Sequence, residues 1–92
     1  MSSPTAFPTD KISIAGTGLA IVGASHFAAP QAFAPITSPL FPDNTRAWTL
    51  RNGGAETAIG MALTNRRTRP IGWFGLPAYL GFLGFRALQA QR

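Results

Sequence analysis

The chain has 92 residues, of which 46% are hydrophobic and only 12% are charged, with a net charge of +5. This length allows one small domain, and so few charges leave a water-soluble domain without a dispersing surface. The absence of cysteine excludes disulfides, thiolate catalysis and cysteine-ligated metals. Ten glycines and eight prolines are tolerated by membrane helices, so the composition favours short membrane spans with proline-rich connections.

A polar tail over residues 1–11 opens the chain, and an apolar run over about 12–29 predicts the first helix. A signal peptide is the alternative interpretation, since Lys11 precedes the run and the Gly23-x-Ser25 spacing resembles a cleavage site. Asp10 and the lack of charge near the first residue argue against cleavage.

The segment that follows is rich in proline and too apolar for a free linker. Prolines at this density exclude a continuous helix and predict a folded-back loop or a short interfacial helix at the membrane surface. The four prolines are Pro30, Pro35, Pro39 and Pro42.

Two further helices are predicted over about residues 46–63 and 70–88, joined by a basic turn that contains Arg66, Arg67 and Arg69. Basic loops prefer the cytoplasm, so the turn and the N-terminus are expected on that side and the proline-rich loop outside. The sequence therefore predicts an all-α, three-helix transmembrane bundle over residues 12–92, multi-pass in a bacterial inner (plasma) membrane. Each run is near the lower length limit for a span.

Small residues recur at helical spacing in all three predicted helices. Such stripes let backbones approach closely, which is how membrane helices pack. They serve either packing within the bundle or the approach of a helix from another subunit or a second copy, with lipid around them. Nucleic acid is not an expected partner, because the basic residues lie between apolar runs. The predicted packing residues are Gly16, Ala20, Ala24, Gly54, Ala58, Ala62, Gly72, Gly75, Ala78, Gly81 and Gly84.

Three polar residues interrupt the apolar runs: His26, Arg51 and Glu56. Since His26 ends the first helix and the second starts nearby, we expect the three to form a buried polar cluster. A structural charge pair, a proton-carrying or quinone-facing site and a metal site are the three interpretations. One histidine and one glutamate supply too few metal ligands, so neither a metal nor a cofactor is expected. No catalytic constellation is present.

Three short motifs resemble DoxX-like membrane proteins: the block from Gly23 to Phe33, the Gly53–Glu56 element and the turn from Thr68 to Trp73. The resemblance implies a four-helix membrane protein, in a family with some members named as subunits of oxidoreductases acting on quinone. By that resemblance His26 and Glu56 are the shared polar positions. The chain departs from it in ending before a fourth helix.

These observations predict a small accessory or structural subunit of a larger membrane complex, respiratory or redox, without catalytic activity alone. The alternative is a quinone-facing or proton-transferring component of a membrane oxidoreductase. A peripheral basic protein bound to anionic lipid is a further alternative.

Overall fold

A computed structural model describes residues 10–91 of the chain, and within this range every regular element is a helix. The helices are α1 (Lys11–Ala28), α2 (Pro30–Thr37), α3 (Thr45–Thr64) and α4 (Arg69–Ala90). The predicted all-α class is confirmed, but the predicted count of three helices is wrong, because the proline-rich connection contains α2. Most of the predicted N-terminal tail, residues 1–9, lies outside the described residues.

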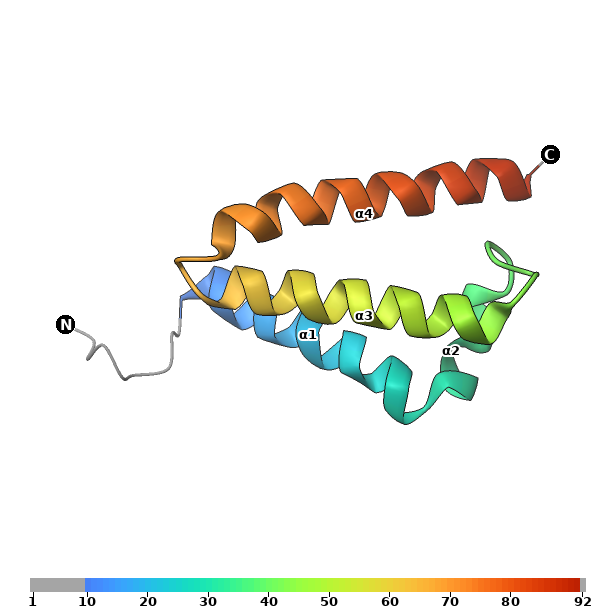
Figure 1. Cartoon of the computed structure of the whole chain (residues 1–92), viewed down its shortest axis with the longest axis horizontal. Helices are drawn as coiled ribbons and strands as arrows, with labels where there is room; N and C mark the ends of the chain where they lie inside the picture. Colours follow the sequence, from blue (N-terminus) through green and yellow to red (C-terminus); the bar gives the residue numbers. More distant parts are fainter. Residues whose placement is uncertain (1–9, 92) are drawn as a thin grey trace.

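The helix α2 forms because its prolines fall where a short helix tolerates them. Ala29 has a non-helical backbone (φ −143°, ψ 65°), as the residue before a proline prefers, and Pro30 then opens the new helix. Pro35 interrupts only one backbone hydrogen bond of this eight-residue helix. The chain bends by 105° between α1 and α2, which turns α2 back across the end of the bundle (Figure 1).

The antiparallel pair α1 and α3 forms the tightest packing of the fold (Figure 1). A methyl group on Gly16 would lie 2.7 Å from the carbonyl oxygen of Gly60, and one on Gly60 would overlap the backbone of Ala20. At the other end of the pair, a methyl group on Gly23 would overlap Thr57. The two backbones are therefore in direct contact, as in membrane helix pairs with small residues at the interface.

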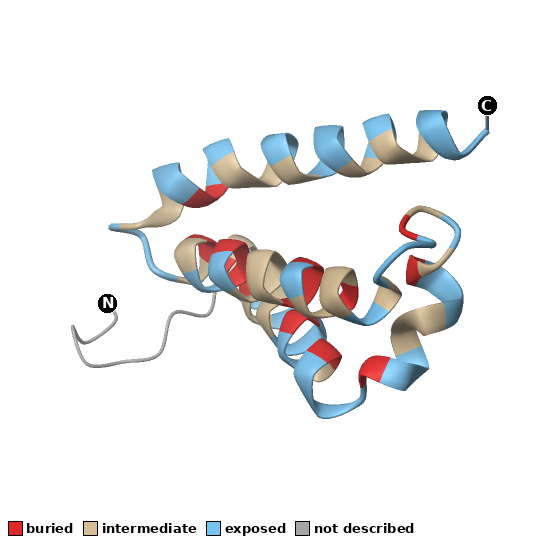
Figure 2. Cartoon of the chain, turned by 45° about the vertical axis from the view of Figure 1, so that its right-hand side comes forward, coloured by how far each residue is buried: buried red, intermediate tan, exposed pale blue. Residues whose placement is uncertain are grey.

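Few large apolar side chains are buried in this fold. Only three large apolar residues are buried among those described, and five polar ones are buried beside them. The buried apolar residues are Phe41, Ile59 and Leu63, and the buried polar ones are Ser13, His26, Thr37, Thr49 and Asn52. Large apolar side chains instead lie on the outside, on α1 and above all on α4, which is exposed along most of its length (Figure 2).

The 22-residue helix α4 is the one described helix that is long and apolar enough by itself to cross a membrane. Its most apolar window has a mean hydropathy of 1.2 and is only 6% buried. The helices α1 and α2 meet the same criterion only when the bent pair is taken together. The structure thus has one candidate span, or two with the bent pair, where the sequence predicted three.

Polar contacts hold both ends of α4 against the rest of the bundle. At its start, Arg69 donates to Asp10 at 3.1 Å and to the Ser13 hydroxyl at 2.9 Å. Near its end, the Arg86 guanidinium lies 4.6 Å from the ring centre of Phe41 and donates to the carbonyl oxygen of Leu40. These contacts hold the two ends of α4 to the start of α1 and to the loop before α3, and they leave the outer face of α4 uncovered.

Candidate functional site

Three polar side chains from three helices meet in the middle of the bundle. Tyr79 of α4 donates its hydroxyl hydrogen to Oε2 of Glu56 in α3, at 2.6 Å. The same oxygen lies 3.8 Å from Nε2 of His26 in α1. The side chains of His26 and Glu56 are only 7% and 14% exposed. A short hydrogen bond to a carboxylate in a shielded environment is a strong one, so this contact ties α4 to α3.

Local contacts fix the imidazole of His26 in one orientation. Its ring stacks on Phe33 of α2, with centroids 3.7 Å apart and planes at 17°. Nδ1 lies 2.8 Å from the carbonyl oxygen of Val22. A carbonyl oxygen only accepts hydrogen bonds, so Nδ1 carries a proton and donates it there. Nε2 is therefore the nitrogen that faces Glu56.

A cavity of about 120 Å³ opens beside these three residues. Its polar lining adds Asn52 and Thr37 to them, and both of these residues are buried. The remaining lining is apolar and comes from α2, α4 and the loop before α3: Phe33, Ile36, Leu40, Phe41 and Leu83. A mostly apolar hollow with a few convergent polar groups is the usual form of a small-molecule site.

Arg51 does not join the predicted polar cluster. Its guanidinium lies 4.8 Å from the ring centre of Trp48, on the exposed side of α3. Five residues along a helix rotate a side chain by about 140°, so Arg51 and Glu56 face different directions. Tyr79 and Asn52 contribute to the site instead. Tyr79 had one sequence signal, since it is the only tyrosine in the chain and lies among phenylalanines and leucines.

The predicted packing residues fall into two groups in the structure. Some lie in tight contacts: Gly16 against α3, and Gly72 and Gly75 against Leu63 and Ile59. Others face open space, since an added methyl group at Gly81 or Gly84 would meet nothing within 4 Å. Of the predicted residues in α3, Gly54 is only loosely packed and Ala58 is exposed, whereas Gly53 and Gly60 make the closest approaches.

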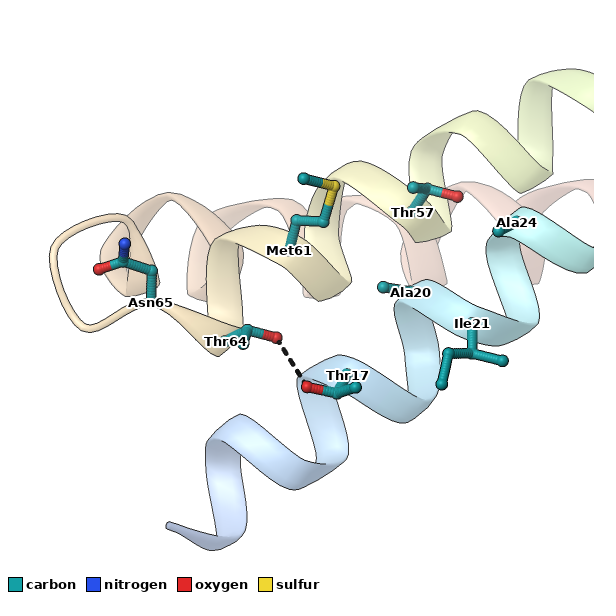
Figure 3. Close-up of a pocket in the computed structure, with 8 residues that line it drawn as sticks. All are labelled: Thr17, Ala20, Ile21, Ala24, Thr57, Met61, Thr64 and Asn65. Carbon is teal, nitrogen blue, oxygen red and sulfur yellow. Dashed lines mark hydrogen bonds between the residues drawn. The ribbon is translucent and has the colours of Figure 1, made fainter. Parts of the chain in front are cut away.

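A larger, open groove of about 520 Å³ runs between α1 and α3 (Figure 3). It carries no charged side chain, and its threonine hydroxyls are already engaged with backbone carbonyl oxygens of their own helices. Thr17 donates to Ser13, Thr57 to Gly53 and Thr64 to Gly60. The groove therefore presents mainly methyl groups and offers no chemistry of its own.

The basic turn is partly occupied by contacts within the chain. Arg69 is held by Asp10 and by the carbonyl oxygen of Leu63, at 2.9 Å. Arg66 lies 3.7 Å from Asp10 with a side chain that is 80% exposed, and Arg67 is also exposed. Among residues 10–91, no group of three or more histidine, aspartate or glutamate side chains is placed to hold a metal ion.

A family match covers most of the chain. Residues 15–85 match the family described as "Domain of unknown function (DUF8561)". No curated protein and no solved structure matches the chain. The resemblance to DoxX-like proteins is therefore wrong, and with it the expectation of a missing fourth helix. Its three motifs are short and rich in small residues, which close helix packing produces in unrelated proteins.

Proposed function

Since the chain belongs to the DUF8561 family, whose description assigns no activity, we propose its function from the structure. It is a small integral membrane protein and serves as an accessory, structural subunit of a larger membrane complex. One observation carries this proposal: small and polar residues fill the inside, while large apolar residues cover the outside.

Exposed apolar surface of this extent favours lipid over water as the surroundings. Phe74 is 83% exposed, Ile36 is 73% and Ile71 is 68% exposed. Water-soluble monomers rarely expose continuous apolar surface on this scale. In lipid the same side chains cost nothing to expose, because acyl chains are as apolar as they are.

The polar residues are arranged as a membrane interior requires. Every fully buried side-chain nitrogen or oxygen among the described residues has a hydrogen-bond partner. Thr49, for instance, is fully buried and donates to the carbonyl oxygen of Thr45 at 2.9 Å. Satisfied polar groups are obligatory where no water is available.

The helix α3 contains charged residues and is not apolar enough to span a membrane by itself. Its neighbouring helices cover its central polar side chains. It lies between α1 and α4 (Figure 1), and its central polar residues Asn52 and Glu56 line the internal cavity. Arg46 and Arg51 lie towards the start of α3. Long arginine side chains near a helix end reach the headgroup region. We place the turn with Arg66 and Arg67 on the cytoplasmic side.

The role as a subunit rests on the outer face of α4. Gly81 and Gly84 leave a notch near the exposed ring of Phe85, and no segment among residues 10–91 fills it. Small residues on one face of a helix allow a second helix to approach its backbone closely. A helix of another subunit in this notch would cover surface that the chain leaves open.

Purification in mild detergent from native membranes tests this proposal. We expect the wild-type chain to co-purify with other membrane proteins, and Gly84→Leu to lose them, because the leucine fills the notch. Gly18→Leu is the matched control, since Gly18 also faces open space but lies on α1. A wild-type chain that purifies as a monodisperse monomer of 9.7 kDa would contradict the subunit role. Release by alkaline carbonate would contradict membrane integration and support the peripheral alternative.

A further inference from the structure

The cavity beside His26, Glu56 and Tyr79 has the size of one six-membered ring. Its volume is about 120 Å³. An apolar protein cavity of about 150 Å³ is known to hold benzene. The walls suit a ring as well, because Phe33 and Leu83 line the cavity from two different helices. Filled with water instead, the same space would hold about four molecules, at about 30 Å³ each.

One atom on the polar side of the cavity, Nε2 of His26, has no hydrogen-bond donor beside it. Nδ1 of His26 carries a proton, because it donates to Val22. With one proton on the ring, Nε2 is therefore an acceptor. It faces Oε2 of Glu56, another acceptor, across 3.8 Å, which is too long for a direct hydrogen bond. Oε2 already accepts the hydroxyl hydrogen of Tyr79, so Nε2 of His26 is the acceptor that has no donor beside it.

The geometry points to a binding site for a neutral six-membered ring that carries an O–H group, the phenol class. The ring lies among the apolar side chains, and its hydroxyl donates to Nε2 of His26 or to the Glu56 carboxylate. Asn52 lines the same cavity, and its amide is available as a further polar contact for the ligand oxygen.

Other ligand classes fit these residues less well. An anion would be repelled by Glu56, and a hydrocarbon ring without a hydroxyl would leave Nε2 of His26 without a donor. A metal ion would find one histidine and one carboxylate, which are too few ligands. A charged amine would lose its hydration on entering a mostly apolar cavity. A hydroxyl provides the donor without a net charge.

The chain offers a direct readout, because His26 is its only histidine. In protein labelled with ¹⁵N-histidine and held in detergent micelles, 4-methylphenol is titrated while the Nε2 resonance is followed. We expect a saturable shift of this resonance, as a nitrogen gains a hydrogen bond. Toluene has the same ring and methyl group without the hydroxyl, and it should produce at least a tenfold smaller effect at equal concentration in the micelle.

The wild-type comparison decides the proposal without any variant. Equal shifts with 4-methylphenol and toluene would indicate partition into the micelle and overturn it. No shift with either would indicate a cavity that holds water only, and would overturn it too. Glu56→Gln replaces the charged acceptor by a neutral one and should weaken binding of 4-methylphenol about tenfold. Met61→Ala, in the open groove between α1 and α3, should leave the binding unchanged.

Discussion

Gly53 of α3 lies so close to His26 of α1 that a methyl group at position 53 would overlap the Cβ of the histidine. The same methyl group would lie 2.7 Å from the carbonyl oxygen of Gly23. This glycine thus allows α1 to approach α3, and it places the imidazole 3.8 Å from Glu56. The polar site therefore depends on a residue that has no side chain.

Gly53→Ala should push His26 away from Glu56 and destabilise the bundle. Since the clash involves backbone atoms as well as a side chain, we expect a loss of about 1–3 kcal/mol in the free energy of unfolding, measured in detergent micelles. The neighbouring Gly54→Ala is the control, because its nearest contact is Phe27 at 3.8 Å. Alanine favours a helix, so this control should be neutral or slightly stabilising. Equal effects of the two substitutions would contradict the close approach.

Tyr79→Phe removes the hydroxyl that donates to Glu56 and should weaken the attachment of α4 to α3. We expect a loss of about 1–2 kcal/mol in the free energy of unfolding, because the acceptor is a carboxylate in a shielded position. A double-mutant cycle with Glu56→Gln isolates the pair. The effect of Tyr79→Phe should fall to less than half in the Glu56→Gln background, and additive effects would show that the two groups do not interact.

Asp10 should make stability depend on pH in acid. The backbone N–H of Ser13 donates to this carboxylate, and together with Arg69 it lowers the pKa of Asp10 below its ordinary value of 3.8. The unfolded chain therefore takes up the proton first as the pH falls, so the stabilising effect is present above pH 3.8 and is lost below it.

Asp10→Asn tests this pH dependence, because asparagine still caps the helix but does not titrate. The stability difference between wild type and variant should shrink as the pH falls from about 6 towards 3. Asp43 and Glu56 are present in both proteins, so their titration cancels in the comparison. A difference that stays constant over this range would contradict the role of the Asp10 carboxylate.

The all-α class could be predicted from the sequence, because apolar runs and small residues at helical spacing are local signals. The proline-rich segment was predicted only as a folded-back loop or a short interfacial helix, since four prolines within thirteen residues normally interrupt a helix. Only the backbone positions of Pro30 and Pro35 show that a short helix tolerates them. The number of helices is hard to predict for such a segment, because a helix forms only if each proline lies at a position in the helical turn where it is tolerated.

The site could be predicted only in part, for a reason of geometry. Histidine and glutamate are rare in apolar runs, so the residue type alone was enough to identify His26 and Glu56 as candidates. The different directions of Arg51 and Glu56 follow from the rotation of the helix. The position of the Arg51 side chain over Trp48 depends on its contact with the aromatic ring, which the rotation does not specify. Tyr79 was missed because its hydrogen bond to Glu56 joins two helices, and a single sequence does not specify which residues of two packed helices lie at the same level.

Arg86 and Arg51 both lie near Trp48, yet only Arg86 should matter for stability. Arg86 is half-buried, stacks over Phe41 and donates to the carbonyl oxygen of Leu40, whereas Arg51 is exposed. Lysine lacks the planar guanidinium, so Arg86→Lys should lower the free energy of unfolding by about 1 kcal/mol. Arg51→Lys should change it by less than half as much. A larger effect of Arg51→Lys would contradict this account of how the end of α4 is held.

The most direct test of membrane integration uses the absence of cysteine from the chain. Leu80 is 55% exposed at the middle of α4, so in a water-soluble fold a cysteine there would react readily with a water-soluble maleimide. We measure the labelling rate of Leu80→Cys in membrane vesicles opened by freeze–thaw, with Asn65→Cys in the exposed turn as the control. The account predicts rapid labelling at position 65 and almost none at position 80. Equal rates at the two positions would contradict it.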